Sequence, residues 1–440
     1  MPQPMTRRPT WHFPNPPSAD IIGPMASLFN AWREAPGDTR LLFATRILRL
    51  FAYGFLSVIL ALYLGRLGLS EASIGLLLTL TLLGDTLISL WITTHADRLG
   101  RRRMLLTGAV LMVLAAILFA ATRDFYLLLL AATIGVISPS GNEIGPFLPI
   151  EQASLTQLVS GRRRTGVFAW YNLVGSFATA TGALAGGGLS QLLQAAGFTP
   201  LASYRLVVLG YGLVGLIMAG LFTRLSSAIE TRTGDSPGPA ASRPLLGLHR
   251  SRRVVFRLAA LFSLDAFAGG FVIQSLLALW FNLKFGVEPA VLGAIFFGAN
   301  LLAGVSALSA AWVAARIGLI NTMVFTHLPS NLLLILVPFM PSLGLAIVVL
   351  LLRFSISQMD VPTRQSYTMA VVAPEERSAA SGVTGVARTI GASLSPLFAG
   401  VFMSNPALLA LPFVISGGLK IVYDLALFWN FRTVKPPEEE

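Results

Sequence analysis

The stretch Asp97-Arg98-Leu99-Gly100-Arg101-Arg102-Arg103 separates two apolar runs, residues 74–92 and 104–121. A helix needs about 20 apolar residues to cross the hydrocarbon core of a bilayer, so both runs are long enough to span it. Glycine allows the chain to turn tightly between them, and arginines remain among the lipid headgroups. A short charged loop of this kind is typical of a chain that crosses a membrane and turns back.

The composition of the whole chain is that of a protein that crosses a membrane many times. Of its 440 residues 54% are hydrophobic and 12% are charged, and the mean hydropathy is +0.72. Soluble proteins carry roughly 25% charged residues. The composition therefore excludes a soluble enzyme, a disordered protein and a repeat solenoid. The net charge of +12 lies in basic runs between apolar stretches, which orient spans and do not indicate nucleic-acid binding.

Several kinds of chemistry have no residues to support them. The chain has no cysteine, and its four histidines lie far apart, so we expect no disulfide, no metal site and no cofactor. It lacks Gly-Lys-Ser/Thr and Gly-x-Ser-x-Gly, so we expect neither an ATPase nor another enzyme. The expected partners are a small-molecule substrate, protons and the lipid bilayer, and we expect a monomer.

Twelve apolar runs predict an all-α membrane protein with twelve transmembrane helices in two six-helix bundles. Basic residues gather in alternate loops and in a polar linker, which places both termini in the cytoplasm. The lack of Asn-x-Ser/Thr and of cysteine is typical of a protein of the bacterial inner (plasma) membrane. The predicted spans are 41–64, 74–92, 104–121, 125–157, 165–193, 205–223, 254–283, 290–313, 319–340, 343–370, 378–403 and 409–430.

Polar interruptions divide the chain into five parts. Apolar residues recur at helical spacing between Ile21 and Trp32, which favours an interfacial helix in the N-terminal segment; a disordered leader is the alternative. The parts are a cytoplasmic N-terminal segment, an N-terminal bundle, a cytoplasmic linker, a C-terminal bundle and a cytoplasmic tail, at 1–40, 41–225, 226–253, 254–430 and 431–440.

The two bundles repeat each other in sequence. Arg98 of the first half has its counterpart in Arg316 of the second, and Glu151-Gln-Ala-Ser matches Arg364-Gln-Ser-Tyr. The matching segments follow one another in the same order in both halves. Parallel six-helix repeats place a ligand site at their interface near the midplane of the membrane, where one half rocks against the other.

The order Asp-Arg-x-Gly-Arg-Arg between spans two and three, together with twelve spans and a repeat of six, resembles the major facilitator superfamily. The signature usually begins with glycine where this chain has Thr93. The resemblance implies a secondary transporter that alternates between inward-open and outward-open states, with spans one, four, seven and ten lining the cavity. It also implies a gating loop, formed here by Asp97, Arg98, Gly100, Arg101 and Arg102.

A weaker resemblance is to the glycine-rich motif of drug exporters. Residues 182–188 in span five and 391–400 in span eleven are rich in small residues. Such residues mostly permit close helix contact, so they favour efflux only slightly. The arginine that drug exporters have early in span four is missing here, and Arg353 holds the comparable position in span ten.

Ionisable residues inside a span are costly and are functional candidates by default. The repeat aligns Phe51-Ala-Tyr-Gly-Phe with Phe267-Ala-Gly-Gly-Phe, which pairs Arg49 with Asp265, while Glu151 aligns with Arg364. Equivalent positions thus have opposite charges. Ion pairs form either within each half or across the halves. Arg46, Lys420 and Asp424 are expected near span ends, where their heads reach the interface.

Span four contains Pro139, Gly141, Pro146 and Pro149, which cannot sustain a regular helix. Broken backbone at membrane depth is tolerated where it is buried in protein or lines a water-filled cavity. The break is either a binding element or a kink needed only for packing, and the nearby carboxylates favour the first. Substrate candidates around the cavity are Arg49, Asn142, Glu151, Asp360, Arg364, Gln365 and Arg388.

We predict a proton-coupled secondary transporter, since no ATPase is present. Glu143 is the first candidate for the proton carrier, followed by Asp265 and Asp85, because a buried carboxyl has its pKa raised towards neutrality. Efflux of a small amphiphilic compound is the leading direction. Uptake of a small organic solute is the alternative, and a transporter-like sensor or scaffold without turnover is the alternative of a different class.

Overall fold

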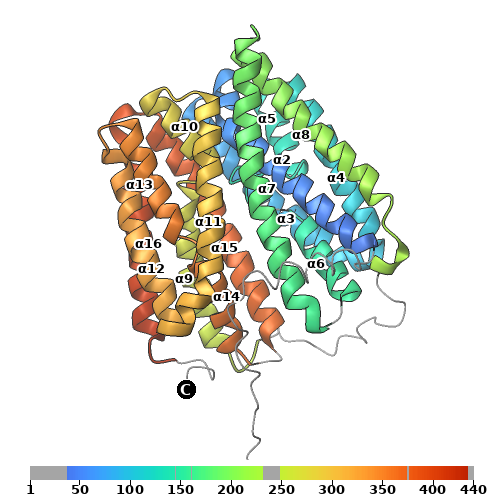
Figure 1. Cartoon of the computed structure of the whole chain (residues 1–440), viewed down its shortest axis with the longest axis vertical. Coiled ribbons are helices and arrows are strands. Elements are labelled where there is room, and N and C mark those ends of the chain that lie inside the picture. Colours follow the sequence, from blue (N-terminus) through green and yellow to red (C-terminus); the bar gives the residue numbers. More distant parts are fainter. Residues whose placement is uncertain (1–36, 144, 160, 231–247, 374–375, 435–440) are drawn as a thin grey trace, which may run out of the picture.

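The computed structural model describes residues 37–143, 145–159, 161–230, 248–373 and 376–434. The predicted interfacial helix and most of the linker and tail lie outside the described residues. Within the described part every regular element is a helix, so the predicted all-α class is confirmed (Figure 1).

The N-terminal half contains seven α-helices and one short 3₁₀ helix in the described residues. Its elements are α2 (Gly37–Arg66), α3 (Glu71–Leu99), α4 (Arg101–Ala121), α5 (Phe125–Ile134), α6 (Phe147–Leu158), α7 (Gly161–Ala195), α8 (Pro200–Phe222) and η1 (Ser227–Ile229).

The C-terminal half has the corresponding elements after the linker. They are α9 (Arg252–Gly270), α10 (Gln274–Phe285), α11 (Pro289–Ile317), α12 (Leu319–Leu336), η3 (Val337–Phe339), α13 (Leu343–Ile356), α14 (Asp360–Ala370), α15 (Arg377–Met403), η5 (Pro406–Leu408) and α16 (Leu411–Phe431).

These helices form two bundles of membrane-crossing segments. Ten segments of the described chain are long and apolar enough to cross a membrane; the 35-residue α7 and the pair α5–α6 are the remaining two. Large apolar side chains such as Leu114, Leu213 and Trp429 are exposed, as expected where a helix faces lipid. The predicted twelve-helix fold in two bundles is therefore confirmed.

The breaks in spans four and ten lie at equivalent positions of the two halves. α6 and α14 both begin directly after a break, at Phe147 and at Asp360, which are equivalent positions in the two halves. Pro149 and Pro362 are the third residue of these two helices. Proline is tolerated there because the first turn of a helix has no internal partner for its N–H group.

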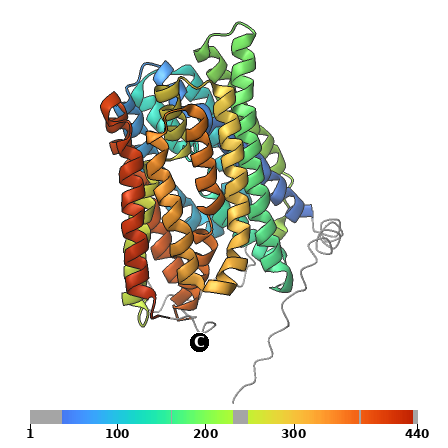
Figure 2. The same ribbon diagram turned by 60° about the vertical axis from the view of Figure 1, so that its left-hand side comes forward.

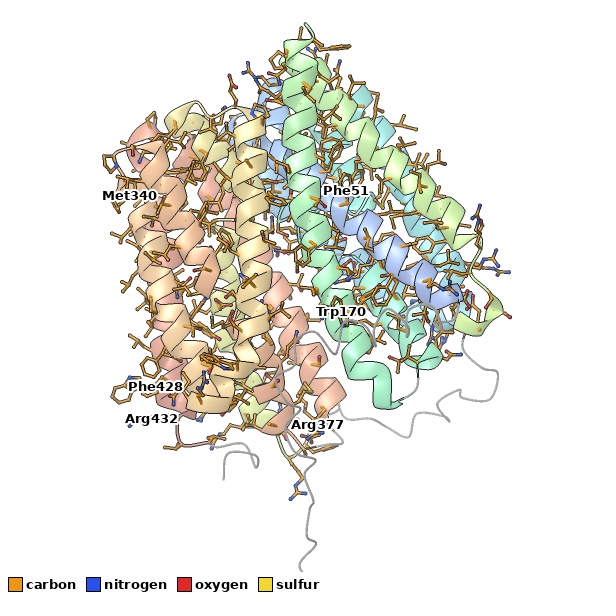
Figure 3. All side chains as sticks on the ribbon, viewed as in Figure 1. Phe51, Trp170, Met340, Arg377, Phe428 and Arg432 are labelled. Carbon is orange, nitrogen blue, oxygen red and sulfur yellow. The ribbon has the colours of Figure 1, made fainter. Side chains whose placement is uncertain are left out.

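Glycines let equivalent helices approach closely in both halves. α2 packs along α7, and α9 packs along α15 in the same way. A Cβ atom on Gly54 of α2 would lie 2.1 Å from the carbonyl oxygen of Thr179, and one on Gly270 of α9 would lie 2.4 Å from that of Ala392. Such distances are too short for any larger residue, so both contacts require glycine. Phe51, one turn before Gly54, lies on α2 beside α7 (Figure 3).

The two halves meet through a second pair of matching contacts. α3 packs on α15 and α7 packs on α11. Gly75 lies against Gly400 in the first contact, and Gly187 lies against Gly293 in the second. The glycine-rich stretches of spans five and eleven thus hold backbones together, as the packing interpretation of these residues expects.

The halves are joined at one end of the molecule. The α3–α15 contact involves Glu71, at the start of α3, and the α7–α11 contact involves Pro289, at the start of α11. The two bundles come together at this end and diverge towards the other, where Trp170 and Arg377 lie (Figures 1 and 3). In Figure 1 α2, α4 and α8 run obliquely to the nearly upright α7 and α11, and α7 and α11 lie side by side in Figure 2 as well. The diverging end is the one at which α8 ends, α9 begins and α16 ends.

Candidate functional site

An N-terminal charge cluster lies between α2, α6 and the break that precedes α6. Arg49 donates to both oxygens of Glu151, at 2.6 and 2.7 Å, and both side chains are fully buried. Its Nε also donates to Glu143 at 2.8 Å. The guanidinium stacks over the ring of Phe147 at 4.9 Å. Arg49 therefore links a carboxylate in the break to one on α6.

Arg46 completes this cluster from one turn earlier in α2. Its Nη1 donates to Glu143 at 2.7 Å, while its other nitrogens donate to the Tyr171 carbonyl at 2.6 Å and to Asn172 at 3.2 Å. Tyr171 in turn donates its hydroxyl to Glu151. Two arginines thus balance two glutamates, and we call Arg46, Arg49, Glu143 and Glu151 the N-terminal cluster.

Asp85 does not take part in the ion pairs of the N-terminal cluster. It is on α3, with 4% of its surface exposed, and its Oδ2 accepts from the backbone N–H of Gly145 at 3.1 Å. Ser89, one turn further along α3, is its other polar neighbour. No cation pairs with Asp85 among the described residues. It is a buried carboxyl at the break without a counter-charge.

The break in span four meets a second break across the two halves. The chain between α9 and α10 is also interrupted, and Ser275 in the first turn of α10 donates its N–H to the Pro139 carbonyl at 3.0 Å. The Ser275 hydroxyl reaches the Pro139 and Ser57 carbonyls, at 2.7 and 2.8 Å. Gln274 donates to the Ser57 hydroxyl at 2.8 Å. Backbone groups released by one break are therefore satisfied by the other.

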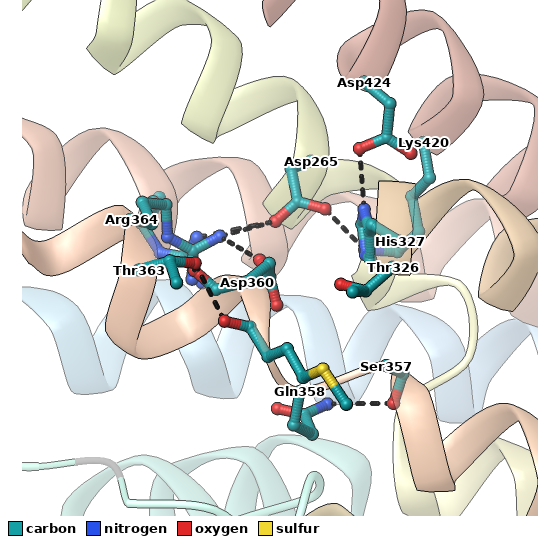
Figure 4. A network of polar contacts seen from close by, with 12 residues as sticks. Asp265, Thr326, His327, Ser357, Gln358, Asp360, Thr363, Arg364, Lys420 and Asp424 are labelled. Atoms are coloured by element: carbon teal, nitrogen blue, oxygen red, sulfur yellow. Dashed lines mark hydrogen bonds and ion pairs between the residues drawn. The ribbon is translucent and has the colours of Figure 1, made fainter. Parts of the chain in front are cut away.

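A C-terminal charge cluster occupies the corresponding place in the second half (Figure 4). Asp265 on α9 accepts from Arg364 at 3.1 Å and from Lys420 at 2.5 Å, and Arg388 approaches it at 3.5 Å. Arg364 also binds Asp360 at 2.9 Å. The ion pairs thus form within each half, which confirms the first of the two pairings that the repeat allows.

Asp424 extends this cluster into a polar network on α12. It accepts from Asn331 at 2.8 Å and contacts Nδ1 of His327 at 2.8 Å. All three side chains are almost fully buried. We call Asp265, Asp360, Arg364, Arg388, Lys420 and Asp424 the C-terminal cluster; it contains three cations and three carboxyls.

The expected interfacial placement of Arg46, Lys420 and Asp424 is wrong. Their exposed fractions are 5%, 7% and 0%. Arg46 and Lys420 each form an ion pair inside their bundle, and Asp424 is bound by His327 and Asn331, so none of the three needs to reach the interface. His327 and Asn331 were not found among the candidates. Their spacing of four residues on one helix face, in an apolar span, is the signal that could have found them.

Arg353 is a buried charge of the second half that lies outside the ion pairs, as Asp85 does in the first half, although the two positions are not equivalent in the repeat. It lies in the last turn of α13 with 7% of its surface exposed. Its Nε has no partner, and no ion pair or hydrogen bond to its side chain is found among the described residues; its guanidinium lies 4.9 Å from the Phe354 ring centre. The C-terminal half thus contains a buried cation without a counter-charge.

Two further candidates stand apart from both clusters. Asn142 is exposed within the break, and its backbone groups bind the side chains of Ser138 and Ser140. Gln365 is exposed on α14 beside the buried Arg364. Neither side chain joins the charge networks in the described part of the chain.

The predicted gating loop lies within the N-terminal half. Gly100 has φ +99°, which lets α3 turn directly into α4. Glu230 accepts the backbone N–H groups of Arg101 and Arg102, at 2.7 and 3.2 Å. Arg101 also donates to Gln157 and Ile229, at 3.0 and 3.1 Å. Arg98 is exposed, and the side chain of Asp97 lies outside the described residues.

The sequence matches a known family along most of its length. The family model described as Major Facilitator Superfamily aligns with residues 42–396. This chain belongs to the major facilitator superfamily. As a member it is a multi-pass membrane protein and a secondary transporter of a small-molecule substrate.

The comparisons with individual proteins agree with this assignment. The uncharacterized membrane protein YJR124C of Saccharomyces cerevisiae is 31% identical over 434 residues, which covers 92% of this chain and 97% of the relative. The quinolone resistance protein NorA of Staphylococcus aureus is 33% identical over 85 residues, 19% of this chain and 22% of its own. A bacterial homologue of the human lysosomal transporter Spinster, in an inward-facing and unoccupied conformation, shares the fold, with TM-score 0.67, 16% identity and coverage of 89% and 94%.

Proposed function

We propose that this protein is a proton-coupled transporter that exports a small amphiphilic compound across the plasma membrane by alternating access. The main observation behind the proposal is Asp85, a buried carboxyl without a cation beside the broken span four. A transporter without an ATPase needs an ion gradient to drive accumulation, and a carboxyl is the simplest proton carrier.

The environment of Asp85 suits a proton carrier better than that of Glu143. Burial without a counter-charge favours the neutral acid, and contact with water favours the carboxylate. A carboxyl that is dry in one state and wet in another therefore loads and releases a proton. Glu143 and Asp265 are each neutralised by cations at 2.5 to 3.1 Å. We therefore place Asp85 first, with Glu143 and Asp265 as secondary candidates.

The contacts between the halves are suited to a reversible gate. Ser275 and Gln274 bind Ser57 and Pro139 across the interface through four hydrogen bonds. These are neutral bonds, so opening this end exposes groups that water can satisfy at modest cost. The buried charge pairs, in contrast, remain within each half and need not separate when the halves rock.

Orientation and direction rest on the sequence. The basic linker places the diverging end, with both termini, in the cytoplasm, so the described state opens inwards. We propose export because 85 residues of the chain resemble a quinolone resistance protein and because the cavity-lining spans are rich in Phe, Leu and Met.

Proteoliposomes with a trapped pH dye test proton coupling. Amphiphilic compounds are first selected by their effect on thermal stability, and proton flux is then measured together with compound flux. Asp85→Asn retains an oxygen for the Gly145 N–H but has no proton to release, so it should abolish accumulation while leaving compound-for-compound exchange. It should also fold normally, because no cation loses its partner.

Glu143→Gln is the matched control. It leaves Arg46 and Arg49 without one carboxylate, so it should lower stability and transport together. Accumulation of the compound by Asp85→Asn at the wild-type level, with the proton flux intact, would exclude Asp85 as the carrier.

A further inference from the structure

Arg353 is a buried cation that no carboxylate of the described residues pairs with. The residue has an exposed fraction of 7%, its Nε has no partner, and it forms no ion pair among the described residues. A buried charge without a counter-charge costs several kcal/mol. An ionisable residue inside a span is therefore a functional candidate. We expect Arg353 to gain an anionic partner during the transport cycle.

The nearby carboxyls are already occupied. Asp265 and Asp360 act on Arg353 through space, but both bind Arg364, and Asp265 also binds Lys420. The C-terminal cluster has as many cations as carboxyls. Adding Arg353 to the six residues of this cluster therefore leaves one excess positive charge.

The surroundings of Arg353 provide further donors. The break between α13 and α14 follows it by one turn, and the side chains of Ser357 and Gln358 lie in this break near the C-terminal cluster (Figure 4). Arg388 approaches the same Asp265 at 3.5 Å and has 34% of its side chain exposed. Arg388 is therefore a second, partly exposed cation of the same cluster.

The unpaired carboxyl of the other half does not neutralise this charge. Asp85 binds the backbone of Gly145 in its own half, and the contacts between the halves near the breaks are made by neutral groups. Since the carboxyls named above are engaged elsewhere, a small ligand from outside the chain can supply the negative charge.

We infer that the transported compound has an anionic group, a carboxylate, sulfonate or phosphonate, which binds to Arg353 beside the break in span ten. This inference rests on the proposed function and specifies the substrate class. The apolar part of the compound would occupy the region between the halves. A guanidinium binds such oxyanions through parallel N–H···O bonds.

Calorimetry on the purified full-length chain in phosphatidylcholine nanodiscs tests this inference. The probes are benzenesulfonate, benzoate and phenylphosphonate, with benzyltrimethylammonium and benzamide as cationic and neutral analogues of similar size. We expect the anions to bind more tightly than either analogue. Arg353→Gln should weaken anion binding about tenfold or more, since it removes a charged hydrogen bond, and Arg353→Lys should weaken it less.

Arg316→Gln is the matched control. Arg316 is exposed at the end of α11 and stacks on Trp312 at 3.4 Å, away from the cluster, so anion binding should not change. Equal binding of anionic, neutral and cationic probes, or undiminished anion binding by Arg353→Gln, would overturn the inference.

A second experiment distinguishes a lipid headgroup from a free solute as the anion bound at Arg353. In nanodiscs with added phosphatidylglycerol, weaker probe binding that depends on Arg353 would identify a lipid headgroup as the occupant, and unchanged binding would identify a free solute. Proton flux in the proteoliposome assay tests the proposed function separately. Normal proton coupling without anion preference would reject this inference alone, and anion binding without any flux would reject the transport proposal alone.

Discussion

The two halves agree in how their backbones pack and differ in their charges. Gly54 and Gly270, which the repeat aligns, make equivalent close contacts with α7 and α15. The ion pairs at equivalent positions have opposite polarity: arginine on α2 pairs with glutamate on α6, and aspartate on α9 pairs with arginine on α14. The two halves therefore share their helix packing but not the signs of their buried charges.

The unpaired groups show what this difference permits. The N-terminal half has Asp85 left over and the C-terminal half has Arg353 left over. A free carboxyl suits a proton, and a free guanidinium suits an anion. On the proposed function, divergence of charges on a common frame would give each half a different solute to bind.

The largest expected effect comes from reversing one buried charge. Arg49→Glu would place a third carboxylate beside Glu143 and Glu151, and we expect it to cost about 3–5 kcal/mol and to prevent stable folding. Adding Glu151→Arg gives the pair the polarity found in the other half, so it should recover part of the folded protein. Size-exclusion profiles and apparent Tm in detergent measure both variants.

A double variant no better folded than Arg49→Glu alone would show that the polarity of each pair is set by its surroundings. Arg46 and Glu143 would then be the reason, because they adjoin only the N-terminal pair.

Adding a methyl group at the interface should have equal effects in the two halves. Gly187→Ala places Cβ 2.1 Å from the Pro289 carbonyl oxygen, and Gly400→Ala places it 2.3 Å from that of Glu71. Each should weaken the closed end by about 1–3 kcal/mol. The reaction of a cysteine introduced at Ser57 with an impermeant maleimide reports opening, and the chain has no native cysteine.

Gly188→Ala is the control for this pair, because a Cβ there meets nothing within 4 Å. Unequal labelling of the Gly187→Ala and Gly400→Ala variants would mean that one interface dominates the gate and that the packing symmetry is not functional.

The smallest expected effect concerns acid sensitivity outside the spans. Glu376 is buried before α15; burial opposes its ionisation, but N–H groups of Ser251, His249 and Arg250 hold its pKa at about 2. Because the folded pKa is below the ordinary value of about 4.3, its stabilisation is complete above that value and is lost as pH falls towards 2.

Glu376→Gln should therefore lower the apparent Tm at pH 7, and the difference from wild type should shrink between pH 4.3 and 2. The exposed Glu288→Gln serves as the control. A difference independent of pH would assign the effect of Glu376 to packing and not to its charge.

Much of the fold follows from local sequence. Apolar runs of about 20 residues demand helices in a bilayer, because unpaired backbone groups cannot remain in hydrocarbon. Pro139, Gly141 and Pro146 exclude a regular helix in span four, and the structure has its break there. The sequence repeat also aligned Arg49 with Asp265 and Glu151 with Arg364. It thereby identified the residues of both ion pairs, Arg49–Glu151 and Asp265–Arg364.

Partner choice required the tertiary structure. Whether Arg49 meets Glu151 or a residue of the other half depends on which helices adjoin, and helix packing depends on contacts such as Gly54 with Thr179. Burial of Lys420 and Asp424 likewise depends on the rotation of α16.

The sequence by itself determined the membrane-spanning class, the twelve segments, the broken span and the repeat, because hydropathy and backbone chemistry act within a few residues of the chain. Only the tertiary structure decided which buried charges are neutralised, and that Asp85 and Arg353 have no oppositely charged partner among the described residues. The physical reason is that the energy of a buried charge depends on atoms a few ångströms away, and those atoms come from helices that lie far apart in the chain.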